Sequence, residues 1–219
     1  MDRLVTLLPE LWAATFETLY VVSIALLFGG LAGLLLGLAL YATRPGSLFP
    51  QRVVFGVLNV VVNFFRPIPF VILLAAVQPL ARGIGIPGIG PEFGIFAISL
   101  ASMFAISRIV EQNLLTVDRG VIEAARAAGA SRSRILFRLV PREALGPLIL
   151  GYTFILVALV DMTAIAGAVA AGGLGEFAIV YGFRQFNPAV TWAAVLVIIV
   201  IVQAVQFLGN ALARKVLRR

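Results

Sequence analysis

Hydrophobic residues gather in five long stretches along the chain, and most charged residues lie between them. Each stretch is at least as long as the roughly 20 apolar residues with which an α-helix crosses the core of a bilayer. The predicted membrane-spanning helices are residues 18–41, 53–79, 93–113, 144–170 and 189–213. Residues 4–12 form a shorter apolar segment, which we expect along the membrane interface because Trp12 stands near the headgroup level. The pattern predicts an all-α polytopic membrane protein with residues 1–219 in one transmembrane domain.

The composition agrees with a bilayer as the main solvent. Of the 219 residues, 61% are apolar and 12% are charged, and the mean hydropathy is +1.06. Soluble domains are nearer half apolar and a quarter charged, and a domain of this size has too much surface to bury such an excess. The chain has no cysteine and no histidine, which excludes disulfides, thiolate nucleophiles and the commonest general base. We therefore expect no catalytic, metal-binding or cofactor-binding residue on this chain.

The distribution of basic residues predicts the orientation of the helices, because cytoplasmic loops are enriched in Lys and Arg. With five spans, one side of the membrane holds Arg44, Arg52, Arg119, Arg126, Arg132, Arg134, Arg138, Arg142, Arg214, Lys215, Arg218 and Arg219. The other side holds only Arg3, Arg82 and Arg184, interspersed with acidic residues. This asymmetry places the N-terminus outside and the C-terminus in the cytoplasm. Orientation alone accounts for the net charge of +7, and nucleic acid is not needed to explain it.

The long cytoplasmic loop between the third and fourth spans, residues 116–143, is expected to form two short helices around a sharp turn. Asp118 suits an N-cap, and Gly129 suits the left-handed conformation that ends a helix. Ser131 or Ser133 can cap the second helix. A basic hairpin of this kind can lie on anionic lipid. Against that, the first helix carries alanines where a lipid-dipping helix carries Leu, Phe or Trp, so we favour insertion into a groove on another protein.

A motif in this loop resembles one found in a known family. Glu123, Ala124 and Ala125, followed after three residues by Gly129, resemble the EAA motif of ABC importer permeases. The resemblance implies that the loop is the coupling helix that docks onto a cytoplasmic ATPase subunit, and it assigns these four residues to ATPase coupling. The proline expected later in the pattern comes one residue early, as Pro141, which leaves the end of the second loop helix open.

Segments on both sides of the loop narrow the resemblance to the methionine importer permease family. They are residues 41–46, 63–70, 167–175 and 181–186. The resemblance implies a homodimer, two cytoplasmic ABC ATPase subunits, an extracytoplasmic substrate-binding lipoprotein and a place in the bacterial inner membrane. It also implies that ATP and Mg²⁺ bind the partner subunit and that this chain is not an enzyme. A P-loop needs a Lys on the phosphates, and Lys215 in the basic tail is the sole Lys of the chain.

Charged residues and prolines inside the spans are candidates for the translocation pathway, since a charge in the hydrocarbon is costly. Arg66 stands about midway along the second span, and Pro67 and Pro69 each remove a backbone donor there. Transporters line solute cavities with interrupted helices of this kind. We expect Arg66, Pro67 and Pro69 to border the pathway or its gate. The alternative is a structural arginine that binds the freed carbonyl groups.

Other polar residues of the spans also have two interpretations, one in the pathway and one in the structure. Asn59 and Asn63 precede Arg66 on the same helix face, and they either share a polar lining with it or form ordinary interhelical hydrogen bonds. Asp161, followed by Met162, lies midway along the fourth span and is also assigned to the pathway. We favour an ion pair between Asp161 and Arg66 over contact of Asp161 with the ammonium group of a solute.

Glycine-rich segments are assigned mainly to packing and turns. The four-residue repeat of Gly29, Gly33 and Gly37 is expected to let another helix approach closely. Residues 170–175 are expected to turn outside the membrane, as are residues 83–90. Beyond the first of these turns, Glu176, Tyr181 and Arg184 either contact the delivery protein or belong to a solvated loop.

The favoured function is the membrane-spanning permease subunit of an ATP-driven importer that moves a small amino acid, methionine by resemblance, through alternating access. An autonomous channel or secondary transporter is the main alternative, although the spans hold few acids beyond Asp161 and Glu111 to couple an ion. A non-transporting membrane anchor would leave Arg66 and its neighbouring prolines unexplained.

Overall fold

The computed structural model describes residues 5–169 and 171–217, and the described part consists of helices and the turns between them. The elements are α2 (Leu8–Thr43), α3 (Arg52–Phe65), α4 (Phe70–Gly83), α5 (Pro91–Leu115), α6 (Arg119–Ala127), α7 (Arg132–Arg134), the π-helical segment η1 (Ile135–Leu139), α8 (Val140–Glu143), α9 (Leu145–Gly167), α10 (Gly173–Phe177), the π-helical segment η2 (Ala178–Phe183) and α11 (Pro188–Leu217).

Four helices among the described residues are long and apolar enough to cross a membrane, namely α2, α5, α9 and α11. The stretch at residues 53–79 does not form one straight helix, because α3 and α4 meet at a bend of 110°. The predicted interruption at Pro67 and Pro69 is thus confirmed, since the second predicted span is a bent pair of helices. A helix of 14 residues reaches only about 21 Å, so α3 by itself is shorter than the hydrocarbon core. By length and composition, the described residues hold four candidate spans, or five if the bent pair counts as one.

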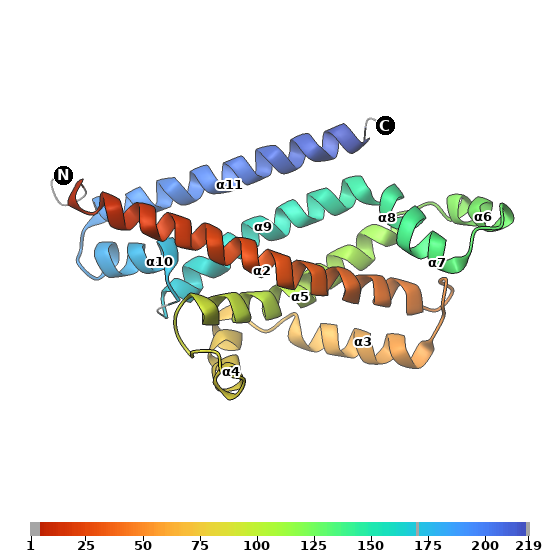
Figure 1. Cartoon of the computed structure of the whole chain (residues 1–219), viewed down its shortest axis with the longest axis horizontal. Coiled ribbons are helices and arrows are strands. Elements are labelled where there is room, and N and C mark those ends of the chain that lie inside the picture. The colour runs from red at the N-terminus through yellow and green to blue at the C-terminus, as the bar shows by residue number, and fades with distance from the viewer. Residues whose placement is uncertain (1–4, 170, 218–219) are drawn as a thin grey trace.

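The long helices lie along the long axis of the molecule (Figure 1). In this view α2 and α5 run from the end with α10 toward the end with α6, α9 returns, and α11 runs in the same direction as α2. The short helices α6, α7 and α8 gather at one end of the molecule, and α11 ends on that side. Helix α3 begins at this end too, and α4 turns away from the axis near the opposite end.

The first helix is longer than predicted. Residues 8–12 belong to α2 and continue into the apolar stretch without interruption, so the prediction of a separate interfacial segment is wrong for them, and Leu4 lies outside the described residues. The physical reason is that Pro9 stands in the first turn, where a missing N–H is harmless, and no breaker follows before the span. With 36 residues, α2 extends about 54 Å and exceeds the bilayer core.

Helices α2 and α5 form the centre of the fold through a glycine face. A Cβ added at Gly33 would lie 2.6 Å from the Cβ of Ile106, and one at Gly37 would lie 2.6 Å from the backbone oxygen of Ser107. Gly29 approaches the backbone oxygen of Ser99 in the same way. The prediction that these glycines allow close helix packing is confirmed.

Candidate functional site

The coupling-loop region extends from the end of α5 to the start of α9. The Asp118 side chain accepts a hydrogen bond from the backbone N–H of Gly120 at 2.6 Å, and the Ser131 hydroxyl oxygen accepts one from that of Arg134 at 3.3 Å. Gly129 has a φ of +79° between the two helices. The predicted caps and turn are therefore confirmed. No side chain of α6 is buried, and Glu123, Ala124 and Gly129 are exposed.

The second helix of the loop packs firmly onto the rest of the molecule. Ile135, Leu136 and Val140 are buried in the main apolar core. The second loop helix consists of α7, η1 and α8 in succession, and it ends at Glu143. The early position of Pro141 had left this end open. A π-helical segment shifts the hydrogen-bond register, and Pro141 then falls in the first turn of α8, where its missing N–H is tolerated.

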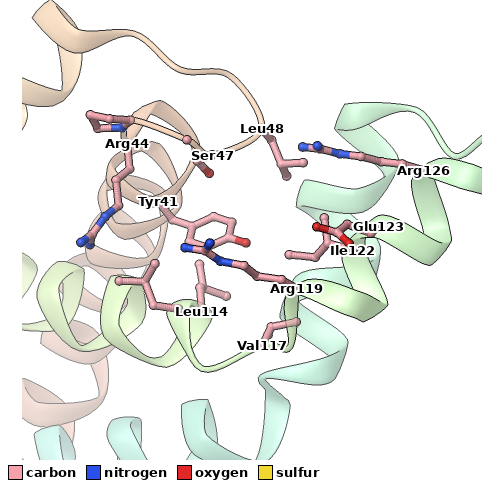
Figure 2. A pocket seen from close by; sticks show the side chains of 13 residues that line it. Tyr41, Arg44, Ser47, Leu48, Leu114, Val117, Arg119, Ile122, Glu123 and Arg126 are labelled. Carbon is pink, nitrogen blue, oxygen red and sulfur yellow. The ribbon is translucent and has the colours of Figure 1, made fainter.

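A cavity of about 230 Å³ separates α6 from the ends of α2 and α5 (Figure 2). Tyr41 and Arg44 line it from the α2 side, and Arg119, Glu123 and Arg126 line it from α6. The rest of its lining comes mainly from the turn after α2 and from the last residues of α5. The exposed helix α6 thus faces the ends of the two central helices across this cavity.

The interruption of the second predicted span lies at Arg66 to Pro69. The backbone N–H of Arg66 still donates to the carbonyl oxygen of Val62 at 3.0 Å, and that of Ile68 donates to Phe65 at 3.2 Å. Pro69 then has extended geometry and precedes α4. The side chains of Arg66, Pro67 and Pro69 are exposed at the bend, whereas Asp161, also predicted for the pathway, lies on α9.

The expected ion pair between Arg66 and Asp161 is absent from the described chain. Both side chains are exposed, and each ion pair among the described residues uses Glu111. The reason is topological, because α3 packs against α2 and α5, whereas α9, which holds Asp161, packs mainly against α5 and α11. Met162 is partly buried and packs against the main core.

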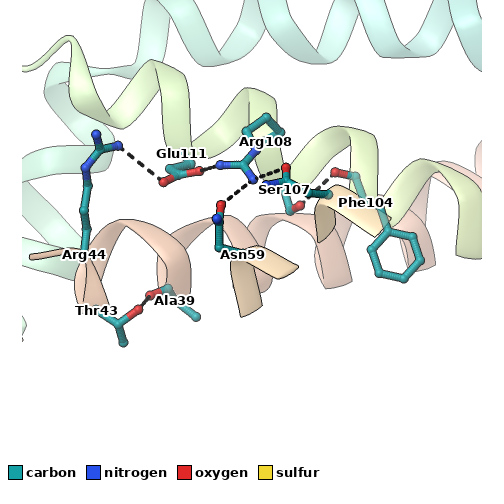
Figure 3. Close-up of polar contacts among 9 residues, drawn as sticks. Ala39, Thr43, Arg44, Asn59, Phe104, Ser107, Arg108 and Glu111 are labelled. Atoms are coloured by element: carbon teal, nitrogen blue, oxygen red, sulfur yellow. Dashed lines mark hydrogen bonds and ion pairs between the residues drawn. The ribbon is translucent and has the colours of Figure 1, made fainter. Parts of the chain in front are cut away.

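Asn59 and Asn63 do not form a polar lining with Arg66. The side-chain oxygen of Asn59 accepts a hydrogen bond from Nη2 of Arg108 on α5 at 2.8 Å (Figure 3). The side-chain oxygen of Asn63 accepts one from the same nitrogen at 2.7 Å. The alternative of interhelical hydrogen bonding is therefore the correct one. The same guanidinium donates through Nη1 to Oε2 of Glu111 at 2.6 Å.

Arg108 is the polar residue that sequence reasoning missed. It lies inside the predicted span 93–113 and stands three residues before Glu111, on the same helix face. A pair of opposite charges at this spacing inside a span was the available signal. We call Arg44, Asn59, Asn63, Arg108 and Glu111 the Arg108 cluster.

At the opposite end of the molecule, the glycine turn between α9 and α10 forms a hydrogen bond with α2. Gly172 and Gly173 have φ values of +83° and +77°. Their backbone N–H groups donate to the carboxylates of Glu176, at 2.9 Å, and of Glu17, at 2.7 Å. Of the turn expected over residues 170–175, residues 171–172 form a turn, residues 173–175 belong instead to α10, and Ala170 lies outside the described residues.

The residues predicted to meet a delivery protein lie beside this turn. Glu176 and Tyr181 line a cavity of about 600 Å³ together with Glu10 and Glu17. Arg184 and Glu176 line a second cavity of about 290 Å³. The other predicted outer turn, residues 83–90, contains Gly85 and Gly90 with positive φ. Among the described residues no group of three acidic side chains is placed to hold a metal ion.

Comparison with known proteins places this geometry in a family. The family described as binding-protein-dependent transport system inner membrane component matches residues 29–218. The methionine import system permease protein MetP of Bacillus subtilis is 41% identical over 97% of this chain and 96% of its own length. The probable D-methionine transport system permease protein MetI of Vibrio cholerae is 36% identical over 94% of this chain and 92% of its own length.

Solved structures agree with the sequence relatives. A chain of the inward-facing MetNI methionine ABC transporter superposes with a TM-score of 0.91, at 35% identity, over 94% of this chain and 95% of its own. A chain of an amino acid ABC transporter, 17% identical, shares the fold with a TM-score of 0.80 over 96% of each chain. The chain therefore belongs to the family of binding-protein-dependent transport system inner membrane components.

Proposed function

We propose that this chain is the permease subunit of an ATP-driven importer of methionine in the bacterial inner membrane. The observation that carries the proposal is the exposed, capped helix α6, which bears the EAA motif and lines a cavity together with the ends of α2 and α5. The chain's similarity over nearly its whole length to permeases named for methionine import supports the choice of substrate.

The proposed subunit has five spans, with α3 and α4 together forming the second. An odd number of crossings agrees with Figure 1, in which α2 starts at the end opposite to the one where α11 finishes. The basic residues of the loop then face the cytoplasm, as the positive-inside rule requires. Residues 1–219 are treated as one permease domain, and the coupling loop is residues 116–143.

The energy comes from the partner subunits in this scheme. Two cytoplasmic ATPase subunits bind ATP and Mg²⁺, and a homodimer of this chain forms the pathway around a twofold axis. Glu123, Ala124, Ala125 and Gly129 form the docking surface. Movement of the ATPase pushes α6, and the short link of residues 116–118 from α5 to α6 passes that movement to the helices that open and close the pathway.

Arg66, Pro67, Pro69, Asp161 and Met162 are proposed to border the pathway or its gate. The exposure of Arg66 and Asp161 supports this assignment, because an exposed charge on a span needs water, a solute or a second subunit beside it. Asn59 and Asn63 are near the pathway through their place on α3, and their side chains bind Arg108.

The outer end is proposed to receive the substrate-binding lipoprotein. Glu176, Tyr181 and Arg184 lie on the segment from α10 to the end of η2 and line two adjoining hollows there. A docked protein that covers this end would release the amino acid directly above the pathway.

Reconstitution in liposomes tests the proposal. The chain, its ATPase and its lipoprotein are expected to accumulate labelled methionine only with hydrolysable ATP. Liposomes with an ATPase variant that binds but does not hydrolyse ATP serve as the control. Uptake by the chain without ATPase would instead establish the autonomous channel or secondary transporter.

A further inference from the structure

The Arg108 cluster has no role in the transport scheme above, although it contains the most deeply buried charge described in the fold. The Glu111 side chain is 1% exposed, and that of Arg108 is 14% exposed. A buried carboxylate requires a nearby cation, because an unpaired charge in such surroundings is strongly unfavourable. Pairing with Arg108 explains why Glu111 is tolerated, and it leaves the other donors of the guanidinium to be explained.

Those donors cross to another helix. Nη2 of Arg108 binds Asn59 at 2.8 Å and Asn63 at 2.7 Å, so one guanidinium holds a carboxylate on α5 and two amides on α3. The guanidinium is planar and its donors have fixed directions, so these bonds are satisfied together at one relative position of the two helices. The cluster thereby sets the register of α3 along α5.

Apolar contacts between the same helices do not fix the register in this way. The rings of Phe65 and Phe104 stack with centroids 4.8 Å apart, and Val62 and Leu40 are buried beside them. Such packing keeps α3 against its neighbours, but the attraction depends on area and has little directional preference. The helices therefore remain associated without the polar contacts, and those contacts decide how one slides past the other.

The cluster also extends to the cavity that α6 lines. Oε1 of Glu111 lies 3.6 Å from Nη1 of Arg44, at the end of α2, and Arg44 lines the cavity beneath α6. In the other direction, Asn63 stands three residues before Arg66 at the 110° bend. A continuous set of polar contacts thus runs from the wall of the α6 cavity to the interrupted span.

We infer that Arg108 is a positioning residue for transport, which locks α3 to α5 so that the interrupted span moves with the coupling loop as one body. The inference rests on the proposed function and assigns to Arg108, Asn59 and Asn63 the transfer of movement from α6 to the bend. It concerns the ratio of solute moved to ATP hydrolysed, and neither ATPase docking nor solute binding.

The central test replaces both asparagines, as Asn59→Leu with Asn63→Leu. Leucine is favourable in a bilayer, and the Arg108–Glu111 pair stays intact, so the variant is expected to insert and fold. ATPase binding and ATP hydrolysis are expected to stay within about twofold of wild type, while methionine uptake per ATP falls about tenfold. Tyr152→Phe is the matched control, because it removes one hydrogen bond between α9 and α2 outside the cluster.

A second variant keeps the positive charge at position 108 and removes the planar guanidinium group. Arg108→Lys still neutralises Glu111 but lacks the planar array of donors. Uptake per ATP is expected to fall in this variant as well, by a smaller factor, with normal assembly by size-exclusion chromatography. An Arg108→Lys variant that couples as well as wild type would show that charge alone is needed and would overturn the positioning role.

Distances between labels provide a readout besides transport. The chain has no cysteine, so cysteines introduced at the exposed positions Val57 on α3 and Leu115 on α5 are the only labelling sites. In the assembled wild-type complex, the distance between spin labels there is expected to stay the same when ATP binds. In the double asparagine variant it is expected to shift or broaden.

Failure of the inference is distinguishable from failure of the proposed function. If wild-type uptake needs no ATPase, the proposed function is wrong whatever the variants do. If wild-type uptake is driven by ATP, then normal uptake per ATP or an unchanged label distance in the double asparagine variant overturns the role of Arg108.

Discussion

The two sets of charged residues in the spans differ in their partners. In the Arg108 cluster, every charge has a neighbour of opposite sign or an amide within the chain, and Glu111 is buried. Arg66 and Asp161, by contrast, are exposed and have no side-chain partner among the described residues. The difference suggests a division of work, in which satisfied charges hold the helices in register and unsatisfied ones face what the chain meets in the assembly.

We expect the Arg108 cluster to contribute far more to the stability of the fold than Arg66 and Asp161 do. Arg108→Leu leaves the buried Glu111 carboxylate with only the partly exposed Arg44, 3.6 Å from its Oε1, as a neighbouring cation, and we expect a loss of about 3 kcal/mol in the free energy of unfolding. Denaturation of the detergent-solubilised protein measures it. Arg108→Leu combined with Glu111→Leu is the control and is expected to recover most of the loss. Equal stability of the single variant and wild type would contradict the assignment of Arg108 to the fold.

Substitutions of the exposed residues Arg66 and Asp161 are expected to reduce transport and to leave stability nearly unchanged. Arg66→Gln and Asp161→Asn are expected to change the free energy of unfolding by less than about 0.5 kcal/mol, as is usual for exposed sites. Methionine uptake in liposomes is expected to fall about tenfold in each, because an interaction with a charged group on the pathway is lost.

Charge reversal sharpens this comparison. Since the structure forms no ion pair between these residues, Arg66→Asp combined with Asp161→Arg is expected to transport no better than either single change. Recovery of uptake in the double variant would mean that the two side chains pair, across the dimer or in another state of the transporter.

A moderate effect is expected in the coupling loop, which depends on backbone conformation and not on charge. Gly129 has a φ of +79° with open space around it, so Gly129→Ala costs about 1 kcal/mol of backbone strain and no collision. We expect weaker ATPase binding, measured by co-purification, with normal insertion. Gly85→Ala is the matched control, since Gly85 has a φ of +84°, similar open space and a place in the distant outer turn.

The smallest effect is expected for an uncharged contact between helices. Tyr152 donates to the backbone oxygen of Gly30 at 2.9 Å, and Tyr152→Phe removes that bond with little change in shape. Membrane hydrogen bonds of this kind contribute about 0.6 kcal/mol on average, so stability is expected to fall by about that amount and uptake per ATP to stay unchanged. A large loss of uptake would show that satisfied polar contacts in general, and not the Arg108 cluster in particular, govern coupling.

Local signals in the sequence were sufficient for much of the coupling loop. Asp118, Gly129 and Ser131 act on backbone groups within three residues of themselves, so their roles follow from short-range geometry. The glycine face of α2 was equally visible, because a four-residue repeat places small residues on one side of a helix. For the same reason, the prolines after Arg66 announced an interruption of the second span.

The sequence did not predict which side chains on different helices pair with one another. Asn63 had two plausible partners, and it binds Arg108, 45 positions away, instead of Arg66 nearby. The direction of α4 after the bend and the isolation of Asp161 were equally hidden. Pro67 and Pro69 predict that a helix is interrupted, but the packing of the surrounding helices sets the angle between α3 and α4.

The amino-acid sequence was sufficient for the solvent, the approximate positions of the apolar helices, the caps and the glycine turn of the coupling loop and the place of the interrupted span. These features depend on hydropathy and on backbone geometry over a few residues. Only the tertiary structure decided that Arg108 joins α3 to α5, that Glu111 is buried and that Arg66 and Asp161 stand apart. The physical reason is that pairing of charges depends on which helix faces meet, and this is set by packing of the whole bundle.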